Sequence, residues 1–425
     1  MSFDLAITNT QLAGKPVDIL IAGNRIDRIE PHDPARVLDP ATRVVDGRGT
    51  AVLPGLMNAH THTAMAMLRS YADDLPLMQW LQQEIWPFEA KLTEDDVYWG
   101  ARLGCLEMIR TGTTFFSDMY WHLHGTARAA VDAGMRAVVT SVFLDLGDAE
   151  RATVQREAAL REIEEFRSYP DRVQHALGPH AIYSVSEASL RWLAEVAAER
   201  NMRIHIHLSE TIGEVEGCLR DHGVRPVPYL DRLGILSERC FAAHSVHLDD
   251  EEIAILAERG VHPLHCPVSN MKLSSGGPMR FVAMKAAGIE PLIGTDGAAS
   301  NNNLDLFEEL KFAALLAKHE AGDPTVLPAT EAIAMATSYP AAAFRIDAGE
   351  VAPGRLADLI LVDLDDPFVF PGHNLAADLV YSAAGRAVRT TICDGKVLME
   401  DRVIPDEAEI REEVAARLKR LAGTA

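Results

Sequence analysis

The segment Leu53-Pro-Gly-Leu-Met-Asn-Ala-His-Thr-His-Thr63 marks a change in the character of this chain and decides how the rest is interpreted. Pro54-Gly55 is a turn signal, and the apolar run that follows it ends in His60 and His62. Successive side chains of a strand point to opposite faces, so both imidazoles would lie on one face and could bind one ion. Neutral imidazole is the commonest metal ligand in proteins. The segment therefore predicts a strand that ends in part of a metal site.

Downstream of this segment, strands and helices are expected to alternate. Short apolar runs are each followed by a longer stretch with helical periodicity; the runs are 113–116, 136–143, 173–177, 203–208, 240–243, 261–265 and 290–293. Units of this kind predict a (β/α)8 barrel of the TIM type. A doubly wound sheet is the competing architecture, but it requires a glycine-rich phosphate loop after its first strand, and the sequence has none there.

Near both ends of the chain, short runs typical of β-strands occur without intervening helical periodicity. The early runs are 4–8, 17–22 and 43–45, and the late ones are 357–363 and 388–397. We expect these ends to pair into one small β-sandwich domain, followed by an amphipathic helix over 406–421. The predicted division is 1–55 for the N-terminal part of the sandwich, 56–345 for the barrel, and 346–425 for the C-terminal part with the helix.

Composition limits the classes of protein to which this chain can belong. At 425 residues it exceeds the usual size of a single hydrophobic core. A formal net charge of −22 argues against a nucleic-acid partner, because such binding depends on Lys and Arg that neutralise phosphates. The five cysteines are odd in number and scattered, which is typical of reduced intracellular thiols. No signal peptide or charge-free membrane-spanning stretch is visible, so we expect a cytoplasmic protein without a membrane partner.

Catalytic groups collect at the carboxyl ends of barrel strands. The predicted strand ends carry His60, His62, His180, His205, His207, Glu210, His244 and Asp296. Three imidazoles and one carboxylate are a suitable ligand set for Zn²⁺ or Fe²⁺. The remaining groups then supply an acid/base in Glu210 and a polar contact to the bound water in His244. His205 shares the face of His207 but lies deeper in its strand, so we expect a packing or supporting role for it.

These strand ends lie in motifs that resemble the amidohydrolase superfamily. Within it, the chain resembles the 5-methylthioadenosine/S-adenosylhomocysteine deaminases over nearly its whole length, and it is also similar to 5′-deoxyadenosine deaminases. The motifs that carry the resemblance are 54–62 (PGLMNAHTH), 73–80 (DDLPLMQW), 178–184 (GPHAIYS), 205–211 (HIHLSET), 265–270 (HCPVSN) and 294–300 (GTDGAAS). The resemblance implies a barrel hydrolase that acts on C–N bonds of cyclic amidines.

The resemblance also implies roles for single residues. It implies that one divalent metal per subunit, Zn²⁺ or Fe²⁺, is bound by His60, His62, His207 and Asp296. It implies that the catalytic groups are Glu210, His244 and Asp296, and that Trp80, Glu89, His180, Glu210 and Ser300 contact the nucleoside. In the family, the counterparts of Glu89 and His180 hold the ribose hydroxyls. The fourth predicted barrel strand contains no Lys, so the carbamylated lysine that bridges two metals in binuclear relatives has no candidate there.

The substrate implied by the resemblance is a 5′-modified adenosine, deaminated to the matching inosine with release of ammonia. Substrates of this kind are 5′-methylthioadenosine, S-adenosylhomocysteine, 5′-deoxyadenosine and adenosine. Family members that bind the homocysteine tail pair arginines with its carboxylate. In the corresponding region of this chain, 142–151, only Arg151 is available, so we expect Arg151 to contact the substrate and uncharged 5′-substituents to fit better. Family members are often homo-oligomers, so a dimer or tetramer is expected, and nucleoside salvage is the natural pathway.

Two alternatives stay open at this point. A guanine or pterin deaminase, or a triazine chlorohydrolase, shares the same metal core, but a ring without ribose offers no diol to Glu89 and His180. A non-catalytic scaffold that kept only the fold would have lost metal ligands, and none of the expected ligands is missing.

Overall fold

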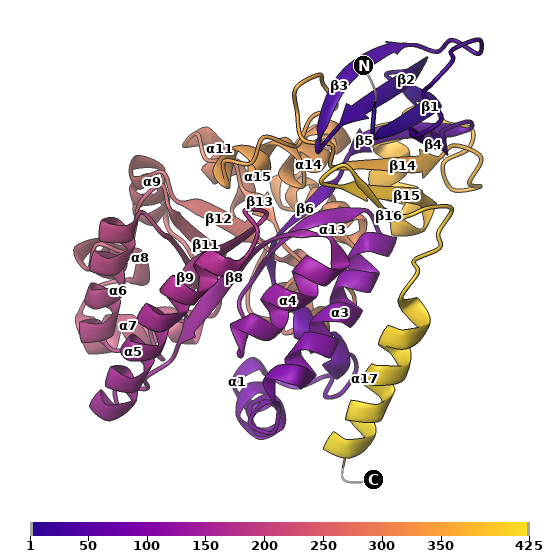
Figure 1. Cartoon of the computed structure of the whole chain (residues 1–425). Helices are drawn as coiled ribbons and strands as arrows, with labels where there is room; N and C mark the ends of the chain where they lie inside the picture. Colours follow the sequence, from indigo (N-terminus) through magenta and orange to yellow (C-terminus); the bar gives the residue numbers. More distant parts are fainter. Residues whose placement is uncertain (1–2, 423–425) are drawn as a thin grey trace.

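The computed structural model describes residues 3–422, and these form a parallel barrel with a separate, mainly antiparallel sheet beside it (Figure 1). The barrel strands follow one another in space in the order of the sequence. They are β6 (Leu56–Thr61), β7 (Thr113–Asp118), β8 (Arg136–Phe143), β9 (Val173–Pro179), β10 (Arg203–Leu208), β11 (Cys240–His244), β12 (His262–His265) and β13 (Leu292–Ile293). The predicted (β/α)8 barrel is confirmed.

The barrel closes where its last strand meets its first. A parallel bridge joins Thr61 to Asp296, and the amide of Asp296 donates to the carbonyl of His60 at 3.0 Å. Gly294 allows this approach, because a Cβ there would lie 2.8 Å from the backbone nitrogen of His60. Closure therefore brings the two ends of a long stretch of sequence into direct contact.

Helices connect the strands and cover the outside of the barrel. They include α3 (Glu94–Arg110), α4 (Leu123–Ala133), α5 (Ala149–Glu165), α6 (Glu187–Arg200), α7 (Ile212–His222), α8 (Pro226–Arg232), α9 (Asp250–Arg259), α11 (Phe281–Ala286) and α13 (Leu306–Ala321). Local sequence fixes several of their ends. Capping boxes begin α3 at Thr93 and α9 at Asp249, where the cap side chain and an acid three residues later satisfy each other's backbone amides. Among the described residues, no helix combines the length and the apolar character needed to cross a bilayer.

The second sheet is built from both ends of the chain. Its strands are β1 (Leu5–Leu12), β2 (Lys15–Ala22), β3 (Arg25–Pro31), β4 (Arg43–Asp46), β5 (Thr50–Pro54), β14 (Leu359–Asp363), β15 (Val388–Cys393) and β16 (Lys396–Met399). Their order is β16-β15-β14-β5-β1-β2-β3, with β4 paired to β1. The early and late strands meet where β5 runs antiparallel to β14, so the expected pairing of the chain ends is confirmed.

Sequence periodicity located most strands but missed two. The runs 136–143 and 203–208 coincide with β8 and β10. The missed strands are β3, whose exposed face carries charges, and β5, which is short and leads directly into the turn at Pro54-Gly55. The predicted C-terminal helix is α17 (Glu407–Leu421), and it lies along α3 (Figure 1). We propose that residues 1–55 and 346–425 form the domain built from the chain ends, and that residues 56–345 form the barrel domain.

Candidate active site

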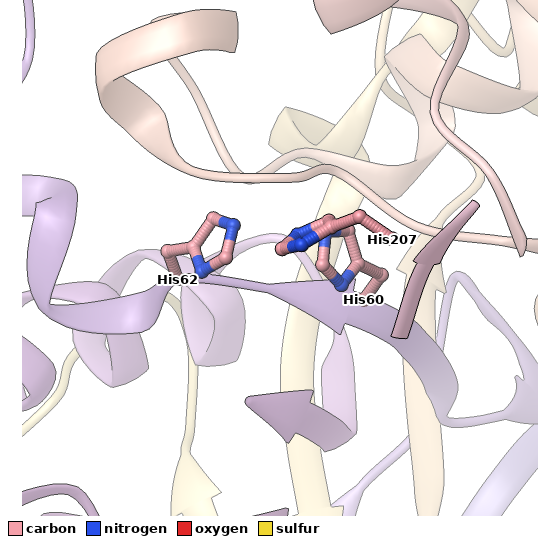
Figure 2. Close-up of side chains that lie close together, drawn as sticks. All are labelled: His60, His62 and His207. Atoms are coloured by element: carbon pink, nitrogen blue, oxygen red, sulfur yellow. The ribbon is translucent and has the colours of Figure 1, made fainter. Parts of the chain in front are cut away.

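Three imidazoles converge at the carboxyl ends of two barrel strands that lie on opposite sides of the barrel. His60 and His62 come from the end of β6, and His207 comes from β10 (Figure 2). His60 and His207 are buried, and His62 is partly exposed to the cavity described below. One nitrogen of each of the three lies within 4.8 Å of a nitrogen of the other two. The strand geometry predicted for the His60-Thr-His62 pair is thus realised, and tertiary folding adds His207.

Hydrogen bonds at Nδ1 orient all three rings. Nδ1–H of His62 donates to the carbonyl of Met119, and Nδ1–H of His207 donates to the carbonyl of His180 at 2.8 Å. Nδ1 of His60 lies 2.9 Å from Nε2 of His205. A ligating histidine commonly donates its other N–H to a neighbouring group, which fixes tautomer and ring direction. His62 and His207 therefore offer the lone pair of Nε2 to the centre, and His60 does so when His205 accepts its Nδ1–H.

Asp296 supplies a carboxylate to the same centre. Its Oδ1 lies 3.2 Å from Nε2 of His62 and 3.5 Å from Nε2 of His60. Its Oδ2 accepts hydrogen bonds from the hydroxyls of Ser269 at 2.6 Å and Ser300 at 3.0 Å. Burial alone would raise the pKa of Asp296, but the imidazoles of His60 and His62 beside it lower that pKa well below its usual range. The acid is thus held as a carboxylate with one oxygen directed at the imidazoles.

This donor set fits a divalent metal. Nε2 of His60 is buried and has no hydrogen-bond partner among the described residues. An orphaned buried nitrogen is costly unless a further group binds it. Three Nε2 lone pairs and one carboxylate oxygen are the ligand types of a zinc site with an open position. The fourth barrel strand, β9, contributes no lysine to the centre.

Glu210 and His244 lie beside the donor set. Glu210 is 7% exposed, accepts from the hydroxyl of Ser275 at 3.2 Å, and burial raises its pKa. Nε2 of His244 lies 3.7 Å from Oε2 of Glu210. The side-chain amide of Asn270 lies 3.0 Å from Nδ1 of His244, and donation to that nitrogen leaves the proton of a neutral ring on Nε2. A protonatable acid and a ring N–H therefore point toward the same space.

The backbone is in the left-handed region at the ends of three barrel strands. The φ angles are 49° at Ser209, 69° at His244, 50° at Ser245 and 59° at Asp296. Such conformations cost free energy in residues with a Cβ, and they collect at functional sites. Here they lie at or just after the ends of β10, β11 and β13, where the chain turns near Glu210, His244 and Asp296.

A cavity opens above these groups and encloses about 660 Å³, open solvent at its mouth included. Trp80, Glu89 and His180 line it together with His62, His207, Glu210, His244 and Asp296. The Glu89 carboxylate accepts from the indole N–H of Trp121 at 3.0 Å through Oε2, while Oε1 is buried without a partner among the described residues. Ser184 donates its hydroxyl to a backbone carbonyl, so His180 donates Nδ1–H to Ser184 and keeps an acceptor lone pair on Nε2. The wall therefore offers two hydrogen-bond acceptors to a ligand.

Two of the expected substrate contacts do not line this cavity. Ser300 is 2% exposed, and its hydroxyl bonds Asp296 and the carbonyl of Gly297. Arg151 lines an adjoining cavity, which shares Trp86, Glu89 and Trp121 with the first and is otherwise bounded by Leu92, His122, Leu144, Leu146 and Ala90. The structure thus brings the other expected residues together and sets these two apart from the main cavity.

Sequence reasoning missed several residues of the wall. Met119, Tyr120 and Trp121 directly follow β7 and line the cavity, as do Trp86 and Tyr183. The available signal was position: an aromatic pair directly after the second barrel strand lies at the end where barrel sites are built. Trp86 and Tyr183 stand in a helix and a loop, where the same residue types usually contribute to the core.

Comparison with known proteins gives consistent similarities. Residues 51–398 match the amidohydrolase family. The chain is 49% identical to a 5′-deoxyadenosine deaminase of Methanoregula boonei, over 98% of this chain and 95% of that protein. It is 47% identical to 5-methylthioadenosine/S-adenosylhomocysteine deaminase 1 of Archaeoglobus fulgidus, over 90% of this chain and 91% of that one.

Solved structures extend these similarities to three dimensions. A zinc-bound adenosine deaminase from Xanthomonas campestris superposes with a TM-score of 0.92 at 35% identity, covering 99% of both chains. A zinc complex of an atrazine chlorohydrolase from Arthrobacter aurescens superposes with a TM-score of 0.87 at 25% identity, covering 97% of this chain and 100% of that one.

Proposed function

The chain belongs to the amidohydrolase family, and from that premise we propose that it is a metal-dependent deaminase of 5′-modified adenosines. The proposed reaction adds water to C6 of the adenine ring and releases ammonia, which leaves the matching inosine. Its substrates are 5′-deoxyadenosine, 5′-methylthioadenosine and adenosine, with S-adenosylhomocysteine as a weaker candidate. The names of the relatives at 49% and 47% identity support this substrate class.

One observation carries the proposal: the cavity has a metal-type donor set at its floor and two hydrogen-bond acceptors on its wall. Oε1 of Glu89 and Nε2 of His180 are both able to accept from hydroxyl donors. A ribose offers two neighbouring hydroxyls, and a site built to hydrogen-bond a substrate hydroxyl rejects analogues that lack it. Free guanine, pterins and triazines have no such diol, so the wall favours nucleosides over them.

His60, His62, His207 and Asp296 would hold one divalent cation, which we propose to be Zn²⁺. A cation held there lowers the pKa of a bound water to about 7 and so supplies a nucleophile at neutral pH. Zinc in two of the similar solved structures supports this choice of metal. The absence of a lysine from β9 supports one cation rather than two.

The protein's own groups move the protons. Oδ1 of Asp296 accepts one proton of the attacking water, and Glu210, whose pKa burial raises, donates its proton to N1 of the ring. Asp296 then passes its proton to the amino group as the C6–N bond breaks, and ammonia leaves. The proton of the new C6 hydroxyl returns to Glu210, which restores both acids. Nε2–H of His244 donates to the oxygen on C6 as charge develops there.

The adjoining cavity gives the 5′-substituent a place. It shares Glu89 with the main cavity, so a ribose held by that carboxylate would direct its 5′-carbon toward Leu92, Leu144 and Leu146. Leucine side chains favour an apolar group such as a methyl or methylthio group. Arg151 supplies one cation at this wall, whereas the bidentate recognition of an amino-acid carboxylate is strongest with well-placed guanidinium pairs. We also expect the protein to form a homo-oligomer, which light scattering can test. We expect its role to be in nucleoside salvage.

Ammonia release on a panel of rings tests the proposal, together with metal analysis of the purified protein. The panel contains 5′-deoxyadenosine, 5′-methylthioadenosine, S-adenosylhomocysteine, adenosine, adenine, guanine and atrazine. The proposal expects about one zinc per chain and turnover of the nucleosides at least about 100-fold faster, as kcat/KM, than of adenine or guanine. Protein that binds no metal, or that acts only on free bases or triazines, would overturn it.

A further inference from the structure

His205 uses both of its ring nitrogens inside the barrel. Its Nε2 lies 2.9 Å from Nδ1 of His60, and its Nδ1 lies 3.1 Å from the hydroxyl oxygen of Ser117. His60 is 0% exposed, and His205 and Ser117 are each 1% exposed. The three side chains come from β6, β10 and β7, so the hydrogen-bonded chain crosses the barrel interior. A histidine that only filled space would not need two aligned polar partners.

The direction of these hydrogen bonds follows from the role of His60. A ring that offers Nε2 to a cation must carry its proton on Nδ1, because a protonated nitrogen has no lone pair. Nδ1–H of His60 then donates to His205, whose Nε2 must be the acceptor. Neutral His205 consequently carries its proton on Nδ1 and donates it to Ser117. Any other tautomer of His205 places a proton on Nε2, and Nδ1 of His60 would have to accept it.

We propose that His205, itself held by Ser117, is a positioning residue that sets the tautomer and direction of His60 for metal binding. This inference rests on the metal site of the proposed function and goes beyond it, because it makes a residue outside the donor set a determinant of metal affinity. Groups that accept the free N–H of a ligating histidine raise its basicity, and their loss commonly costs 10- to 100-fold in metal affinity. His62 and His207 differ from His60 here, because backbone carbonyls accept their Nδ1–H and no side-chain substitution removes those.

Zinc affinity of the apoprotein, measured by competition with a chromophoric chelator, tests the proposal. His205→Leu keeps an apolar side chain in the space but removes the acceptor, and we expect affinity to fall 10- to 100-fold. His205→Gln can place its amide oxygen near the position of Nε2, so we expect affinity within about 3-fold of the wild type. The zinc affinity of Ser117→Ala should lie between those of His205→Leu and His205→Gln.

His175→Leu is the matched control. His175 is also a barrel-strand histidine that bonds a serine, with Nε2 2.7 Å from the hydroxyl of Ser141, but it contacts none of the four donors. The zinc affinity of His175→Leu should equal that of the wild type. Circular dichroism and thermal unfolding of the apoproteins establish that each variant is folded before its affinity is compared.

A second measurement needs no variant of His205. In ¹⁵N-histidine-labelled, zinc-loaded protein, two-bond ¹H–¹⁵N correlations report which ring nitrogen carries the proton. The proposal expects Nδ1–H on both His60 and His205, and a shift of the His60 signals in Ser117→Ala. This readout does not depend on His205→Leu being folded.

The outcomes separate the inference from its premise. An unchanged zinc affinity in folded His205→Leu, or a proton on Nε2 of His205, overturns the inference and leaves the proposed function standing. A glutamine variant that is as weak as the leucine variant also overturns it. A wild type that binds no zinc overturns the proposed function and this inference together.

Discussion

Nε2 of His62 lies 3.2 Å from Oδ1 of Asp296, although the two residues follow the first and the last strand of the barrel. The contact exists because the barrel closes at the bridge between Thr61 and Asp296. Imidazole and carboxylate thus meet at a seam of the fold. Any substitution that separates β6 from β13 should therefore also displace the candidate metal ligands.

Gly294→Ala should weaken that seam. A Cβ at this position would meet the Cβ, N and O of His60 at 2.8 to 2.9 Å, so β13 must shift away from β6. Overpacking of this kind costs about 1–3 kcal/mol of stability. Chemical denaturation of the apoprotein measures the loss, and zinc affinity should fall with it. Gly277→Ala, with no atom within 4 Å of its added Cβ, is the control, and equal effects of the two variants would contradict this reading.

His207→Ala should abolish both metal retention and turnover. The substitution removes one of three converging nitrogens, while the carbonyl of His180 keeps its bond from the backbone amide of residue 207. We expect bound zinc to fall below about a tenth of the wild-type content under dialysis, because loss of a ligand costs more than the 10- to 100-fold of an outer partner. Elemental analysis measures the bound zinc. The control is His373→Ala, at an exposed position, which should keep its full metal content. Full zinc content in His207→Ala would exclude this residue as a ligand.

Glu210→Gln should separate chemistry from metal binding. Glu210 is buried beside His244, and burial raises its pKa, which is the direction that favours a proton donor. An amide keeps the shape but cannot deliver the proton, so kcat should fall about 10²- to 10⁴-fold. Zinc content should stay at the wild-type level. A kcat within threefold of the wild type would remove Glu210 from the proposed proton path.

Glu89→Gln should impair only substrates that carry the ribose diol. Oε1 of Glu89 is the proposed acceptor, and removing one partner of a buried hydrogen bond costs about 1–3 kcal/mol, or roughly 5- to 150-fold in kcat/KM. With 2′,3′-dideoxyadenosine, wild type and variant should differ by less than threefold. An equal loss on both substrates would show that the substitution acts on the cavity in general and not on the diol.

His175 should make the fold sensitive to acid. Burial lowers its pKa from the ordinary 6.5 to about 4, so the unfolded chain binds the proton more strongly than the folded protein. The stability contributed by the neutral ring is complete above pH 6.5 and is lost as the pH falls toward 4. At pH 5 the loss amounts to about 2 kcal/mol, since one pKa unit corresponds to 1.36 kcal/mol.

Denaturant titrations of wild type and His175→Gln between pH 7.5 and pH 5 measure this difference. The variant should lose less stability than the wild type over that interval, whatever the other groups contribute. His373→Gln, at an exposed position, should follow the wild-type curve. Parallel curves for wild type and His175→Gln would mean that His175 is not held neutral by burial.

Local sequence predicted the parts that depend on neighbours along the chain. The runs at 136–143 and 203–208 are strands because β-branched and apolar residues alternate or cluster there, and both coincide with the structure. The strand period of two placed His60 and His62 on one face, as it did His205 and His207. The charged strand Arg25–Pro31 was missed, because its place in the sheet comes from pairing with β2 rather than from its own pattern.

By itself, the sequence determined the order of alternating strands and helices and the residue types at their ends, because both are set by local periodicity and turn chemistry. Only the tertiary structure decided that Asp296 meets His62, that Ser300 bonds Asp296 instead of lining the cavity, and that His205 touches His60 rather than the centre. Each of these depends on barrel closure and side-chain direction. Such distances arise between residues far apart in the chain, and no local pattern encodes them.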